Sequence, residues 1–77
     1  MTRAERKAAA AQQRKKWADE WLAEGQRLRR EGKTRLEVAD YLDQLVTRAA
    51  TSLHNAQISS EIRRAYDEHY QRIAISL

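Results

Sequence analysis

The stretch EGKTRLEVADYLDQL, residues 31–45, holds the end of one helix and the start of another. Gly32 is placed to end the first helix, because glycine readily adopts the left-handed backbone conformation that follows a last helical turn. Thr34 and Glu37 then fit a capping box, in which each side chain satisfies a backbone N–H that the helix leaves unpaired. Apolar residues follow at helical spacing. The stretch therefore predicts two helices joined by a tight turn.

Three segments of the chain place apolar residues on one helical face, and we expect helices at about residues 17–31, 34–54 and 59–75. The third stripe is out of phase with the second, so a break must separate them, and Asn55 and Ser59 offer capping side chains for it. The stripes consist of Trp17, Ala18, Trp21, Leu22, Gly25 and Leu28, then Val38, Tyr41, Leu42, Leu45, Val46, Ala49 and Leu53, and then Ile58, Ile62, Ala65, Tyr66, His69, Ile73 and Leu77.

The composition predicts an all-α protein. The 77 residues include no proline, two glycines and no cysteine, so turn-forming residues are scarce and disulfides are excluded. We expect a small three-helix bundle, in which the second and third helices form an αα-hairpin beneath a long basic N-terminal helix. In this arrangement Trp17 and Trp21 clamp the first helix onto the hairpin.

The positive charge is concentrated at the start of the chain. The net charge is +4, and residues 1–16 hold six basic groups and one acidic group, whereas residues 17–77 are nearly balanced. We therefore divide the chain into a basic arm, residues 1–16, either helical or disordered, and a helical domain, residues 17–77. Basic arms of this kind bind phosphates by displacing counterions. The candidate phosphate ligands in the arm are Arg3, Arg6, Lys7, Arg14, Lys15 and Lys16.

A second basic cluster surrounds the turn at Gly32. It could extend a nucleic-acid footprint, or it could balance the negative end of the first helix dipole, an explanation that we favour for Arg29 and Arg30. The members of this cluster that we include among the candidate nucleic-acid ligands are Arg27, Arg30, Lys33 and Arg35.

Two functional hypotheses follow. The first is a small nucleic-acid-binding accessory or regulatory protein that uses the basic arm on a helical scaffold. The alternative is a protein-binding module, such as a phage- or plasmid-type adaptor or inhibitor, with Trp17 and Trp21 as partner anchors. The second apolar stripe is wider than one neighbouring helix covers, so we also expect a homodimer or a monomer folded onto its target.

Other functions are disfavoured. The chain has no cysteine nucleophile and no phosphate-cradling glycine loop, and the pairs Asp40–Asp43 and Asp67–Glu68 lie on predicted polar faces, so we expect no enzyme. His54 and His69 lack the neighbours of a metal site, and we expect neither metal nor cofactor. No apolar run approaches the length of a membrane span. The lack of cysteine fits a cytoplasmic protein.

Residues 32–42 are similar to the opening of a helix-turn-helix unit: a glycine, a capping threonine, then Glu37, Val38 and Leu42. The sequence departs from it after Leu42, where the apolar pattern predicts a continuing helix in place of a second tight turn.

Overall fold

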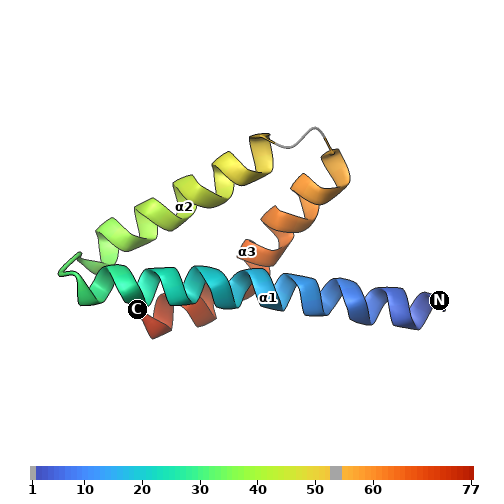
Figure 1. Ribbon diagram of the computed structural model, residues 1–77, viewed down its shortest axis with the longest axis horizontal. Helices are drawn as coiled ribbons and strands as arrows, with labels where there is room; N and C mark the ends of the chain where they lie inside the picture. The colour runs from blue at the N-terminus through green and yellow to red at the C-terminus, as the bar shows by residue number, and fades with distance from the viewer. Residues whose placement is uncertain (1, 53–54) are drawn as a thin grey trace.

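The computed structural model describes residues 2–52 and 55–77, which form three helices and contain no strand (Figure 1). These helices are α1 (Arg3–Arg30), α2 (Arg35–Ser52) and α3 (Ala56–Ser76). They pack against one another; in Figure 1 α3 passes behind α1, and α2 runs obliquely away from the C-terminal end of α1. The predicted all-α three-helix bundle is confirmed.

Helix α1 is continuous and runs through the predicted boundary at residue 16. Thr2 caps its start: the Thr2 Oγ1 accepts a hydrogen bond from the Glu5 N–H and donates one to Glu5 Oε1, each at 3.2 Å. The alanine-rich composition of the first half favours a helix even without an apolar stripe. Of the two states that the sequence left open for the arm, the structure has the helical one from Arg3 onward.

The turn between α1 and α2 follows the prediction closely. Gly32 has φ of 97°, and the Lys33 N–H donates to the Leu28 carbonyl at 3.1 Å, which is the hydrogen bond of a Schellman motif. The capping box is also present, because the Thr34 N–H donates to Glu37 Oε1 and the Glu37 N–H donates to Thr34 Oγ1. These hydrogen bonds hold the pKa of Glu37 below its usual value.

Helix α3 begins at Ala56, so the predicted start at residue 59 is wrong. The Asn55 Oδ1 accepts hydrogen bonds from the N–H groups of Gln57 at 3.0 Å and Ile58 at 3.3 Å, which makes Asn55 the N-cap. Leu53 and His54, including the predicted end of the second helix, lie outside the described residues. No second tight turn follows Leu42, since α2 runs unbroken to Ser52.

The core lies where the three helices meet. Its buried hydrophobic residues are Ala18, Trp21, Val38, Leu42, Val46, Ala50, Ile62, Ala65, Tyr66 and Ile73. The buried residues of α2 recur every four positions and form a narrower stripe than the sequence predicted. Leu45 is only half-buried, and the ring of Tyr41 is 43% exposed. On α3, Ile58 is likewise exposed. The core side chains come from all three helices, so α1 completes the core that the hairpin begins.

This packing bears on the predicted homodimer. That expectation rested on an apolar stripe of α2 wider than one neighbouring helix covers, whereas α2 contacts two helices, α1 and α3. The large apolar side chains that remain most exposed, Leu36 and Ile75, lie on different helices. The fold therefore does not require a second copy, and the oligomeric state stays a prediction for sedimentation equilibrium to test.

Candidate nucleic-acid interface

The first third of α1 projects beyond the bundle. We call residues 3–13 the overhang: in Figure 1 this segment, in blue, extends past the crossing of α1 and α3. All of its residues are exposed except Ala10, which is half-buried. With 11 residues at about 1.5 Å each, the overhang is ~16 Å long. It is a helix whose surface is open to a partner on nearly all sides.

The overhang carries cations without local partners. Arg3, Arg6 and Lys7 are exposed, and none of the ion pairs formed within residues 2–52 and 55–77 involves any of them. The one acidic group of the overhang, Glu5, accepts the Thr2 hydroxyl at the helix cap. Lys15 and Lys16, exposed on the next turn, extend this positive surface toward the bundle. These five cations share one end of the molecule.

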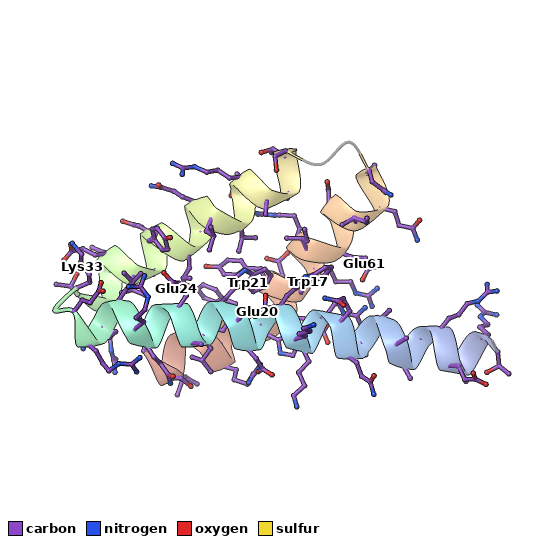
Figure 2. All side chains as sticks on the ribbon, viewed as in Figure 1. Trp17, Glu20, Trp21, Glu24, Lys33 and Glu61 are labelled. Carbon is purple, nitrogen blue, oxygen red and sulfur yellow. The ribbon has the colours of Figure 1, made fainter. Side chains whose placement is uncertain are left out.

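Arg14, a predicted phosphate ligand, is instead buried between two carboxylates of α3. Its Nη1 lies 3.0 Å from Glu61 Oε2, its Nε lies 3.0 Å from Glu68 Oε2, and the residue is 7% exposed. The hydrogen bond to Glu61 raises the pKa of Arg14, despite the opposing effect of burial. The guanidinium is therefore not presented to phosphate, and it fastens α1 to α3 where the two helices cross, near the labelled Glu61 in Figure 2.

Both tryptophans lie on the side of α1 that faces the hairpin (Figure 2). Trp21 is 9% exposed and meets Tyr66 edge to face, with ring centroids 5.7 Å apart and an interplanar angle of 83°. Trp17 is half-buried against the same core. The predicted clamp is confirmed, and the indole of Trp21 is not available as an anchor in a partner.

The second basic cluster lies at the other end of α1. Arg27 is held by Glu24 and Glu31, and its hydrogen bond lowers the pKa of Glu24. Arg29 donates to the carbonyls of Leu77 at 3.1 Å and Lys33 at 2.9 Å, so it serves the turn and the end of α3. The remaining members of the second basic cluster are exposed: Arg30, Lys33 and Arg35. Arg30 stands about 40 Å from Arg3 by helix rise, and Lys33 and Arg35 follow it in the turn and at the start of α2. The two basic regions therefore form no single compact site.

The pairing of Arg14 with Glu61 and Glu68 was not predicted from the sequence. Glu68 was expected on a solvated face, and its side chain is 46% exposed while one of its oxygens bonds Arg14. The signal that could have found them is helical spacing: Arg14 shares a face with Ala18 and Trp21 of the buried stripe. A charged residue on a core face needs a partner of opposite charge. The two carboxylates are seven residues apart, two turns along α3, and both point toward α1.

The described residues show neither a metal site nor a membrane-spanning helix. His69 is half-buried with Nε2 at 4.0 Å from Glu68 Oε1, and residues 2–52 and 55–77 contain no cluster of His, Asp and Glu that could hold a metal. None of the three described helices is long and apolar enough to cross a membrane. Comparisons with protein families, with curated proteins and with solved structures find no match.

Proposed function

We propose that this protein is a small nucleic-acid-binding accessory or regulatory protein, without enzymatic activity, that works in the cytoplasm. The observation that supports the proposal is the placement of Arg3, Arg6 and Lys7 on an exposed helix that projects from the bundle, with no described carboxylate paired to any of them. The bundle is the scaffold, and Arg14 holds the overhang in place.

The chemistry of such a surface is counterion release from phosphates, which is strong and sensitive to salt. For a duplex ligand, each phosphate contact contributes about −0.9 to the slope of log K against log salt. The overhang with Lys15 and Lys16 offers five cations, so full engagement gives a slope of about −4.5. The paired arginines, Arg14 and Arg27, contribute little, because carboxylates already neutralise them.

The test is fluorescence anisotropy with labelled oligonucleotides across a range of salt concentrations. The triple variant R3Q/R6Q/K7Q should bind more weakly, with a slope smaller by up to about 2.7. The variant R30Q/K33Q/R35Q removes the same charge from the far end of α1 and is the matched control, with a smaller loss expected. Equal losses in the two variants would indicate general charge attraction without a site. If the unaltered protein shows no salt-dependent binding to the oligonucleotides, the proposal is wrong.

A protein-binding module is the second candidate, and one feature favours it. A cavity of about 100 Å³ opens between α2 and α3, lined mainly by apolar side chains that include Ala39, Ala74 and Leu77. Tyr70, 47% exposed, and Arg35 also line it. A partner side chain seated there would bind by apolar burial, and such binding would tolerate salt and the loss of the overhang. Homodimerisation through this surface is one form of the same hypothesis.

A further inference from the structure

The overhang is a thin helix. Its middle consists of Ala8, Ala9, Ala10 and Ala11, four consecutive alanines that point around the whole circumference of a helix at 100° per residue. An α-helix with ordinary side chains is about 10–12 Å across, and alanines keep this segment at the lower end of that range. The longer cationic side chains of the overhang, Arg3, Arg6 and Lys7, precede these alanines, and Lys15 and Lys16 follow just beyond the overhang on the same helix.

The overhang is also held in one direction relative to the bundle. It continues α1 without a break, and no proline or glycine occurs before Gly25. Arg14 and the buried Ala18 fix the helix just behind it, and Thr2 caps its free end. The helix emerges straight from the bundle in Figure 1. A preorganised helix of this kind loses less entropy on binding than a disordered arm does.

Among nucleic-acid grooves, one accepts such a helix. The major groove of B-form DNA is about 12 Å wide and 8.5 Å deep, close to the diameter of the overhang. The DNA minor groove, at about 6 Å, is too narrow. The major groove of A-form RNA is deep and narrow, which prevents side chains from reaching its base edges.

On the basis of the proposed function, we infer that the overhang enters the major groove of duplex B-form DNA, with its alanines in the groove and its cations on the flanking phosphates. A segment ~16 Å long corresponds to about five base pairs at 3.4 Å each. A second copy of the chain is a poor occupant of the same face, because each overhang carries three basic residues and one acidic residue, and two surfaces of the same net charge repel each other.

The inference is tested by comparing binding to a short DNA duplex, the RNA duplex of the same sequence, and the single DNA strand at one salt concentration. Groove entry predicts a preference for the DNA duplex over the RNA duplex of about tenfold or more, equivalent to 1.4 kcal/mol. It also predicts that guanine N7, an atom of the major groove, is protected from methylation, while adenine N3 in the minor groove is not.

Two variants replace alanines by glutamines, which makes the helix thicker at those positions and leaves the charge of the protein unchanged. A8Q/A9Q/A11Q thickens the overhang with good helix formers and should weaken DNA binding by about tenfold. A23Q/A56Q, at exposed alanines outside the overhang, should leave it unchanged. Circular dichroism melting establishes that both variants fold.

Equal affinity for DNA and RNA duplexes, with no effect of A8Q/A9Q/A11Q, overturns groove entry and leaves phosphate binding intact. A preference for the single strand also overturns groove entry. No binding to any of the three ligands at low salt overturns the proposed function itself.

Discussion

Arg14 Nη1 lies 3.0 Å from Glu61 Oε2, and this contact joins residues 47 positions apart in the chain. Together with Glu68, it satisfies a guanidinium that the crossing of α1 and α3 removes from water. Arg14 is the buried member of this bridge, whereas the side chains of Glu61 and Glu68 are 33% and 46% exposed. A charge is tolerated away from water only when it is paired and hydrogen-bonded, as this guanidinium is. Arg14 therefore belongs to the architecture of the protein, although its neighbours in sequence belong to the candidate interface.

Arg14→Ala should lower the melting temperature, because Glu61 and Glu68 lose their shared cation and α1 loses a contact with α3. Lys15→Ala, next to it and exposed, is the control and should change the melting temperature very little. Thermal melts followed by circular dichroism measure both. If the two variants melt at the same temperature, the bridge does not stabilise the fold.

Leu42→Ala should destabilise the protein by about 2–5 kcal/mol, because it leaves a cavity among tightly packed neighbours. Leu42 is 1% exposed and lies in the core that all three helices share. Leu36→Ala, on the same helix but 72% exposed, should stay within about 0.5 kcal/mol of the unaltered protein. Urea unfolding measures both, and equal losses would show that the core assignment for α2 is wrong.

Asn55→Ala should destabilise the protein by about 1 kcal/mol, because the Gln57 and Ile58 N–H groups lose their capping acceptor. Ser59→Ala is the informative comparison, since the sequence placed the start of the helix there and the structure places Ser59 within α3. Ser59→Ala should have a smaller effect. If urea unfolding shows that Ser59→Ala is the more destabilising of the two, α3 starts near residue 59, as the sequence predicted.

Tyr66 makes the stability of the fold depend on pH in the alkaline range. Burial, with a smaller contribution from Asp43, raises the pKa of Tyr66 to about 12 from its usual 10.0. Between these values the unfolded chain loses the phenolic proton and the folded protein keeps it, so stability is complete below pH 10 and falls as the pH rises toward 12.

Tyr66→Phe should flatten this decline in unfolding free energy between pH 10 and 12. Tyr70→Phe is the control, because it removes the phenol from the exposed ring that packs edge to face on Tyr66. Urea unfolding at a series of alkaline pH values measures the slopes. An unchanged slope in Tyr66→Phe would assign the alkaline loss of stability to other groups.

The existence of the three helices and the faces on which they pack could be predicted from the amino-acid sequence. Local signals were sufficient for this: the Gly32 turn and the Thr34–Glu37 capping box depend on residues a few positions apart. The apolar stripes identified Leu42, Ile62 and Trp21 as core residues because helical periodicity is a property of each segment alone. The start of α3 was misplaced because Asn55 and Ser59 are both good capping residues, and capping preference alone does not choose between them.

Which cations have a carboxylate partner depends on how the helices pack, and the sequence did not predict it. Arg14, Lys15 and Lys16 are adjacent and chemically alike, yet Arg14 is neutralised by two carboxylates while the lysines are exposed. The difference arises from the crossing of α1 over α3, which brings Glu61 and Glu68 to one face of α1. Arg3, Arg6 and Lys7 form no ion pair with a described carboxylate. Coulombic pairing depends on distances of a few ångströms between side chains far apart in sequence, and three packed helices set those distances.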